Sequence, residues 1–215
     1  MTPVVAPGVS PRFLALVEAE TLSGKRVLDV GCGAGRLALA LAPAARWVVG
    51  LDREATSIAE ATRHATDRGI ANVEFHVADV DGEEYGRFTP DLVVSHLFAS
   101  DPMIERAGRA LAPGACLALV AFHVDQWRET GRVSRFAYDE TRMAQVLAKA
   151  GFRPEVVEVD REERRFATVE EGLAAAVGLE DRWKADGRWY RYVGFLEAGG
   201  RTLTRSHLIV TARRT

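Results

Sequence analysis

Three glycines alternate with other residues directly after a short apolar run near the start of the chain. The segment 27–37 reads V-L-D-V-G-C-G-A-G-R-L, with an acid at Asp29 and glycines at Gly31, Gly33 and Gly35. Because glycine has no Cβ, the backbone can turn sharply here and approach a ligand closely. The apolar run predicts a strand, and the following residues predict a helix whose first N–H groups favour a carboxylate or phosphate. The pattern therefore indicates a ligand site where a strand passes into a helix.

Acidic residues close the first three predicted strands. These residues are Asp29, Asp52 and Asp79. The carboxyl ends of neighbouring parallel strands meet at one edge of a sheet, and carboxylates gathered there repel each other unless a ligand or hydrogen-bond donors compensate. A ligand with a cationic end, ribose hydroxyls and an exocyclic amine would satisfy all three acids. Two plainer roles stay open, a helix N-cap for Asp52 and a turn residue for Asp79.

Strands and helices alternate along most of the chain. Hydrophobic periodicity and capping residues predict strands at 26–30, 47–51, 73–77, 91–97, 116–122, 154–159 and 207–212. Helices are predicted around 13–17, from the glycines to Pro43, and at 54–68, 103–111 and 139–150. This order implies parallel strands joined by right-handed crossovers, as in a doubly wound α/β sheet.

The glycine segment resembles motif I of the class I S-adenosylmethionine (SAM)-dependent methyltransferases, D-x-G-x-G-x-G. A dinucleotide fingerprint, G-x-G-x-x-G, would need glycine where Arg36 stands. The resemblance covers about residues 27–120 and is closest to the small-molecule group typified by ubiquinone- and menaquinone-biosynthesis methyltransferases. It implies a Rossmann-like, doubly wound, seven-stranded sheet that is mostly parallel with an antiparallel last strand and has helices on both faces.

The resemblance also implies a role for each acid. Asp29 would lie near the methionine end of SAM, partly through water, and Asp52 would take both ribose hydroxyls. Asp79 would meet the adenine amine, with the backbone of Val80 also near adenine. Arg53 departs from the family, which often has an apolar residue after the ribose acid, although a guanidinium can stack on a ring.

For methyl transfer, the protein must mainly bring the methyl donor and the acceptor close together and align them. A base is needed only when the acceptor atom must lose a proton. In the resembled family, the end of the fourth strand faces the methyl group, which here adds Ser95 to the cofactor contacts and makes His96 the candidate base or acceptor-orienting residue. The alternative is that His96 only hydrogen-bonds its loop. His123 is a second candidate on weaker grounds, and we expect two further histidines, His64 and His207, to be structural.

A helical insertion at 168–198, opened by a capping box, is the expected cap over the acceptor. Its aromatic residues could hold an apolar or aromatic acceptor, or could merely dock the insertion on the sheet through Trp189, Val193 and Leu196. The aromatic candidates, with one from an earlier loop, are Trp127, Trp183, Trp189, Tyr190, Tyr192 and Phe195. The basic residues of the insertion alternate with acids, which favours a solvated face over an anion site. These bases are Arg182, Lys184, Arg188 and Arg191.

Composition narrows the choice of acceptor and compartment. The 215-residue chain has a formal net charge of −2 and lacks the basic stripe of nucleic-acid binders. Cys32 and Cys116 form neither a disulfide framework nor a paired metal motif, so no metal site is expected. No signal peptide is recognised in residues 1–10, and no apolar run is long enough to span a membrane. We therefore expect one cytoplasmic domain, 1–215, that methylates a small-molecule acceptor, with its oligomeric state open.

Two other functions stay open at this point. One is an NAD(P)-binding oxidoreductase on a Rossmann sheet, against which the glycine spacing argues. The other is a SAM-binding subunit without catalysis, which a closed surface next to the methyl group would favour.

Overall fold

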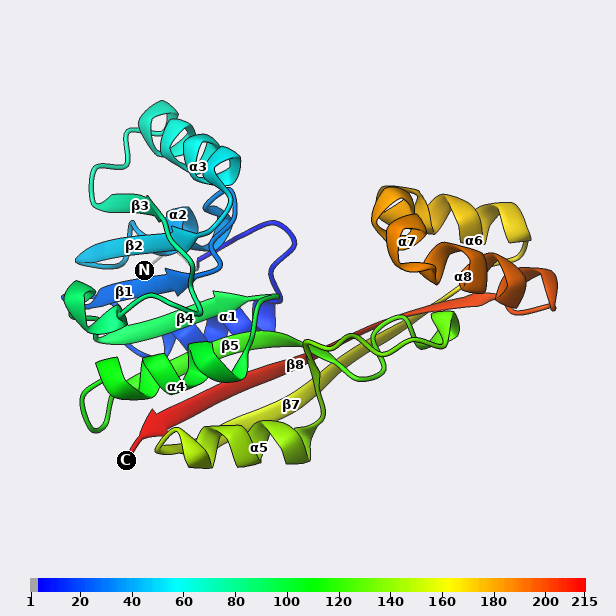
Figure 1. The fold of residues 1–215 in the computed structure, drawn as a ribbon. Coiled ribbons are helices and arrows are strands. Elements are labelled where there is room, and N and C mark those ends of the chain that lie inside the picture. Colours follow the sequence, from blue (N-terminus) through cyan, green and yellow to red (C-terminus); the bar gives the residue numbers. More distant parts are fainter. Residues whose placement is uncertain (1–3) are drawn as a thin grey trace.

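A computed structural model describes residues 4–215, so Met1, Thr2 and Pro3 lie outside the described part of the chain. Its centre is a sheet in the order β3-β2-β1-β4-β5-β8-β7 (Figure 1). The strands are β1 (Arg26–Val30), β2 (Trp47–Asp52), β3 (Val73–Val77), β4 (Leu92–His96), β5 (Cys116–His123), β7 (Phe152–Arg165) and β8 (Thr202–Arg214). Neighbours are parallel except that β8 runs antiparallel to both β5 and β7. The predicted fold class is confirmed. A further two-residue strand, β6 (Ala137–Tyr138), pairs with β5 and was not predicted.

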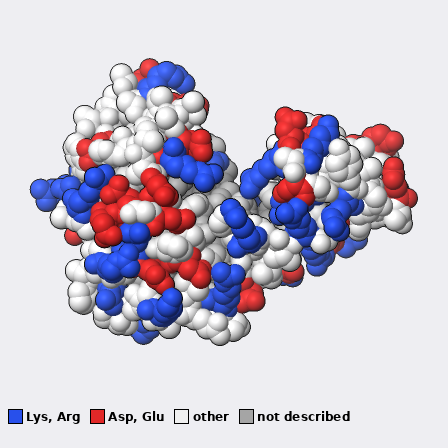
Figure 2. Space-filling view, viewed as in Figure 1, with Lys and Arg blue, Asp and Glu red and all other residues white. Residues whose placement is uncertain are grey.

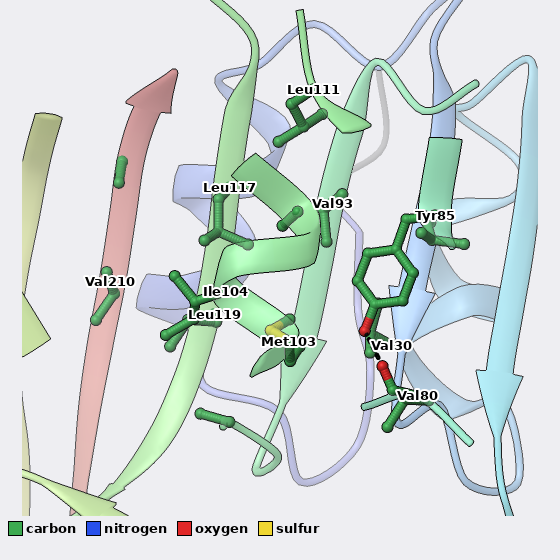
Figure 3. Close-up of a cluster of buried hydrophobic side chains, with 14 of the residues drawn as sticks. Val30, Val80, Tyr85, Val93, Met103, Ile104, Leu111, Leu117, Leu119 and Val210 are labelled. Carbon is green, nitrogen blue, oxygen red and sulfur yellow. Dashed lines mark hydrogen bonds between the residues drawn. The ribbon is translucent and has the colours of Figure 1, made fainter. Parts of the chain in front are cut away.

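Helices cover both faces of the sheet. They are α1 (Pro11–Glu18), α2 (Arg36–Leu41), α3 (Ala55–Asp67), α4 (Asp101–Ala110) and α5 (Glu140–Lys149), with two short 3-10 helices, η1 (Tyr85–Phe88) and η2 (Arg128–Thr130). Successive strand residues point to opposite faces, so Val27 packs with α1 and α2 while Leu28 belongs to the cluster under α4 and α5. In that second cluster, Met103 and Ile104 of α4 lie against the sheet (Figure 3). Burial on both faces explains why the central strands read as continuous apolar runs.

Helix α4 begins two residues earlier than predicted. Its N-cap is Ser100, whose Oγ accepts a hydrogen bond from the Met103 N–H at 3.1 Å, and Pro102 lies in its first turn. Proline is well tolerated there because its missing N–H would have no partner inside the helix. For α5, the predicted N-cap is confirmed, since Asp139 Oδ1 accepts from the Arg142 N–H at 2.7 Å.

Strands β7 and β8 are much longer than the predicted 154–159 and 207–212. Beyond the main sheet they pair only with each other, from Arg161 opposite Ser206 to Arg165 opposite Thr202. Arg205 forms cross-strand ion pairs with Asp160 and Glu162, each at 3.2 Å. We call this two-stranded extension, residues 161–165 and 202–206, the arm.

The arm carries a small helical lobe at its tip, which Figure 2 shows joined to the main body by a narrow waist. The lobe consists of α6 (Val169–Ala176), the 3-10 turn η3 (Val177–Leu179), α7 (Glu180–Asp186) and α8 (Arg188–Glu197). The capping residue Thr168 accepts a hydrogen bond from the Glu171 N–H at 3.2 Å, while the Glu171 carboxylate takes the Ala167 N–H at 2.8 Å. Figure 1 shows the lobe at the end of the molecule where β1 and β4 finish. Among residues 4–215, no helix is both long and apolar enough to cross a membrane.

The segment after β3 is held by a buried tyrosine. The Tyr85 hydroxyl donates to the Val80 carbonyl at 2.7 Å (Figure 3). We expect Tyr85→Phe to lower the free energy of unfolding by about 1–3 kcal/mol, because the buried carbonyl loses its donor. Urea unfolding measures this change, and Tyr190→Phe is the matched control because Tyr190 is 67% exposed. Equal urea midpoints for Tyr85→Phe and the parent would contradict the expected role of this bond.

Candidate active site

The glycine turn joins the end of β1 to α2, and its three glycines serve different purposes. Gly31, Gly33 and Gly35 have φ angles of +72°, +52° and +78°, in the left-handed region that side chains rarely adopt. A Cβ on Gly31 would lie 2.9 Å from the Phe98 side chain, and one on Gly35 would lie 2.8 Å from the Phe75 ring. A Cβ on Gly33 would meet nothing within 4 Å. Packing therefore demands glycine at two positions, whereas Gly33 faces open space.

Asp52 connects the end of β2 to this turn. Its Oδ2 accepts a hydrogen bond from the Gly33 N–H at 2.8 Å, and its Oδ1 accepts from the Glu54 N–H at 3.0 Å. The N-cap of α3 is Glu54, and its side chain makes no capping bond, so the N-cap alternative for Asp52 is wrong. The carboxylate is thus oriented at the sheet edge with lone pairs left for a ligand.

Asp29 is almost completely enclosed beneath the first turn of α2. It is 1% exposed, and its Oδ2 accepts from the Ala38 N–H at 3.1 Å. Burial raises the pKa of this carboxyl to about 7, the Ala38 hydrogen bond opposes that rise, and the nearby Asp52 charge adds to it. Asp29 therefore supports the turn from below and also borders the cavity beside it.

Two adjoining cavities lie at this edge of the sheet. The first, of about 720 Å³, is bordered by the glycine turn and Asp29, and the second, of about 330 Å³, lies between the ends of β2, β3 and β4. Gly31 and His96 border both. The structure brings most predicted site residues to the second cavity, namely Gly31, Asp52, Arg53, Asp79, Val80 and His96.

Asp79 and Arg53 both border the second cavity. Asp79 Oδ1 accepts from the Asp81 N–H at 3.2 Å, which is the turn role that the sequence left open. This bond occupies one oxygen of a carboxylate that also borders the cavity. Arg53 is exposed and pairs with Glu54 at 3.1 Å.

Ser95 differs from the other predicted contacts. It is fully buried, and its Oγ lies 2.7 Å from both the Val30 and the Phe98 carbonyl oxygens. The residue borders neither cavity. Its hydroxyl ties β1 to the loop after β4, and we therefore assign Ser95 to the framework of the site rather than to cofactor contact.

His96 ends β4 at the junction of the two cavities. The next residue, Leu97, has a φ of +61° and turns the chain away from the sheet. Burial, together with smaller contributions from the charges of Arg36 and His207, lowers the pKa of His96 to about 4. The imidazole is therefore neutral at physiological pH and can accept a proton or a hydrogen bond.

The other histidines divide into framework and cavity residues. His123, the second candidate base, is buried, with its Nδ1 3.0 Å from Ser206 Oγ and within 3.2 Å of the Asp125 N–H, so it belongs to the framework. His207 was expected to be structural, but it borders a third cavity of about 490 Å³ that lies under the lobe. Burial also lowers the pKa of His207 to about 4. His207 lies in the predicted part of β8, opposite Phe122 of β5, and the cavity beside it is also bordered by lobe residues such as Arg182, which the arm carries.

Two of the predicted aromatic candidates in the lobe do not take the positions expected. Trp183 and Tyr192 are completely buried (0% exposed) in the lobe's own hydrophobic cluster with Leu196, so they contact neither solvent nor the cavity under the lobe. The predicted aromatic roof is therefore wrong for these residues, as is the docking of Leu196 on the sheet. A lobe held away from the sheet must build its own core. Trp127 and Arg182 do border the cavity under the lobe.

Comparison with known proteins agrees with this geometry. A family described as "Methyltransferase domain" matches residues 21–166. The chain is 40% identical over 121 residues to the 2-heptyl-1-hydroxyquinolin-4(1H)-one methyltransferase of Mycobacteroides abscessus, covering 52% of each chain. It is 32% identical over 104 residues to the ubiquinone biosynthesis O-methyltransferase of Chelativorans sp., covering 46% of this chain and 41% of that one. The chain thus spans about half the length of the curated relatives it matches.

Solved structures show the same fold over nearly the whole chain. The YcgJ protein of Bacillus subtilis superimposes with a TM-score of 0.73 at 15% identity, covering 95% of this chain and 99% of that chain. The family match includes the glycine turn, the three acids and His96, and it confirms the resemblance found in the sequence. The chain belongs to the methyltransferase domain family.

Proposed function

We propose that this protein is a SAM-dependent methyltransferase that acts on a small molecule. The observation that carries the proposal is the grouping of Asp52, Asp79 and His96 around one cavity beside the glycine turn. The printed names of its relatives support the acceptor class, since one acts on a hydroxyquinolone and another belongs to ubiquinone biosynthesis.

The residues present fit SAM. Asp52 and Asp79 offer carboxylate oxygens to ribose hydroxyls and an adenine amine, and Val80 lies beside them. Gly33 faces open space, so the turn can approach the methionine end, on the side where Asp29 borders the cavity. When bound, SAM supplies a methyl group on a positively charged sulfonium.

This chain's own contribution is orientation and, where needed, removal of a proton. The sheet edge fixes the cofactor contacts on rigid strands, which favours an aligned attack. His96 is neutral and stands at the junction of the cavities, so its ring can take a proton from an acceptor hydroxyl or amine. The lobe contributes Arg182 to the borders of both cavities on the acceptor side.

The direct test is methyl transfer itself. The protein is incubated with SAM and a panel of small hydroxy- and amino-aromatic compounds, and S-adenosylhomocysteine release is measured together with the methylated product by mass spectrometry. Calorimetric titration with SAM and with NADH accompanies the screen. Binding of NADH without SAM would overturn the proposal, and SAM binding without turnover across the panel would favour a non-catalytic subunit.

We further propose that residues 1–215 act as one functional unit with the lobe as the acceptor cap. A cytoplasmic location and an acceptor other than nucleic acid belong to the same proposal. The chain's net charge of −2 supports the second point.

His96→Gln is expected to lower kcat by about 10²–10⁴-fold at neutral pH on an acceptor that must lose a proton. Because the pKa of His96 lies at about 4, the parent should keep this contribution from pH 5 to 8 and lose it only as the ring becomes protonated near pH 4. Initial rates across this pH range measure both effects, and calorimetry should show SAM affinity unchanged. Full activity of His96→Gln would return His96 to a framework role.

A further inference from the structure

We infer that the acceptor has an apolar body, either an aromatic ring or an alkyl chain, and also carries a negative charge. Arg182 and Arg164 bind this charge under the lobe. The inference rests on the proposed function and names the acceptor class for the same site. Three observations carry it: the shape of the cavity under the lobe, the distribution of charge along the two cavities, and the partners of the surrounding arginines.

The cavity under the lobe shares lining residues with the cavity that His96 borders. Leu97, Phe122 and Arg182 border both. Trp127 and Leu203 complete the apolar walls of the cavity under the lobe, whose volume of about 490 Å³ lies in the range of small-molecule sites. A molecule held between these walls can extend toward His96.

The two cavities have opposite charge. The one between the strand ends is bordered by four acids, Asp52, Glu54, Asp79 and Asp81, and by only two arginines, Arg53 and Arg182, so acids are in excess. The one under the lobe is bordered by three arginines, Arg164, Arg182 and Arg205, and one acid, Glu162. A cleft lined by one sign of charge concentrates ligands of the other sign. The acidic cavity therefore suits a cationic cofactor, and the basic cavity suits an anion.

Arg182 and Arg164 differ from the other basic residues nearby in having no carboxylate partner among the described residues. Arg205 is neutralised by Asp160 and Glu162, each at 3.2 Å. On the lobe, Lys184 pairs with Glu180 at 2.6 Å, and Arg188 pairs with Asp186. Within residues 4–215, no carboxylate oxygen lies within 4.0 Å of the guanidinium of Arg182 or Arg164. The alternation of acids and bases in the lobe therefore does not neutralise the one lobe arginine that borders both cavities.

Guanidinium groups suit this task chemically. Their planar N–H donors match a carboxylate with two parallel hydrogen bonds, and the same donors can serve a phenolate oxygen. Trp127 and Phe122 beside them favour a ring or an alkyl chain. The acceptor class is thus an aromatic or alkyl-bearing acid or phenolate.

The test compares charged and uncharged forms of the same probe molecules. Protein saturated with S-adenosylhomocysteine is titrated calorimetrically with 4-hydroxybenzoate, 1-hydroxy-2-naphthoate and 4-hydroxyquinoline-2-carboxylate, and with the methyl ester of each. We expect at least one acid to bind about tenfold or more tightly than its ester, as a hydrogen bond to a charged group contributes that much. The variant Arg182→Gln should reduce the preference to less than about threefold, and adding Arg164→Gln should abolish it.

Arg191→Gln is the matched control, because Arg191 is an exposed arginine of the same lobe that borders neither cavity. It should keep the parent's preference for the acid. The inference is overturned if no acid binds, if every ester binds as tightly as its acid, or if Arg182→Gln keeps the full preference. Failure of S-adenosylhomocysteine to bind would instead overturn the proposed function, and this inference with it. Normal cofactor binding with no charge preference would count against the acceptor class alone.

Discussion

An Asp52→Ala variant is expected to bind S-adenosylhomocysteine about ten- to a hundredfold more weakly than the parent protein. The variant removes an ionised acceptor at the proposed ribose position, and such hydrogen bonds contribute about 1.5–3 kcal/mol. It also removes the partner of the Gly33 N–H, which lies 2.8 Å from Asp52 Oδ2, and so loosens the glycine turn beside the site. Isothermal titration calorimetry measures the change directly.

Asp67→Ala supplies the control for charge. Asp67 is an exposed acid at the end of α3 that pairs with Arg63 at 2.9 Å, so the variant changes net charge equally without touching the cavity. We expect its affinity to stay within about twofold of the parent, as for exposed ion pairs in general. Unchanged affinity of Asp52→Ala would show that the ribose assignment is wrong.

Gly35→Ala is expected to lower the free energy of unfolding by about 2–4 kcal/mol. The new Cβ would lie 2.8 Å from the Phe75 ring and 3.0 Å from Ala61 Cβ, in a backbone with φ of +78°. Overpacking of this kind costs about 1–3 kcal/mol, and a left-handed alanine adds about 1 kcal/mol or more. Chemical denaturation followed by circular dichroism measures the loss.

Gly33→Ala separates the two contributions. Its φ of +52° is also left-handed, but its Cβ would meet nothing within 4 Å. Only the backbone strain of about 1 kcal/mol should appear in its unfolding free energy. Equal stability losses in the two variants would mean that contact with Phe75 does not restrict position 35.

The first half of the fold could be predicted well because its local patterns and its tertiary environment agree. Strands β1 and β2 are buried on both faces, so their apolar runs carry the whole signal, and glycines with left-handed φ mark the turn between β1 and α2. The ends of α5 and α6 follow from the capping residues Asp139 and Thr168, which bond locally whatever surrounds them. The positions of Asp52 and Asp79 at one cavity follow from strand order alone.

The arm and the acceptor side could not be predicted in this way. Residues 161–165 are all charged, and their strand conformation depends on pairing with residues 202–206, which lie about forty positions further along the chain. Strand preference of this kind is decided by cross-strand partners rather than by the segment itself. The position of Arg182 at the cavity under the lobe depends on the arm and therefore was missed. His207 lies in the predicted strand, but the lobe residues that border the same cavity are carried by the arm. Trp183 and Tyr192 are aromatic residues of the kind that can cover a ligand, but both are buried in the separate core of the lobe.

The geometry of the arm also bears on how acceptor choice can change during evolution. Arg165 lies opposite Thr202, and the Phe166 N–H donates to the Arg201 carbonyl at 2.9 Å, so the chain leaves and re-enters the arm at one place. A segment whose two ends are neighbours can be exchanged for another of different length without shifting the register of the strands that carry it. Chimeras joined at this point should inherit substrate preference from the donor of the tip and cofactor chemistry from the donor of the sheet.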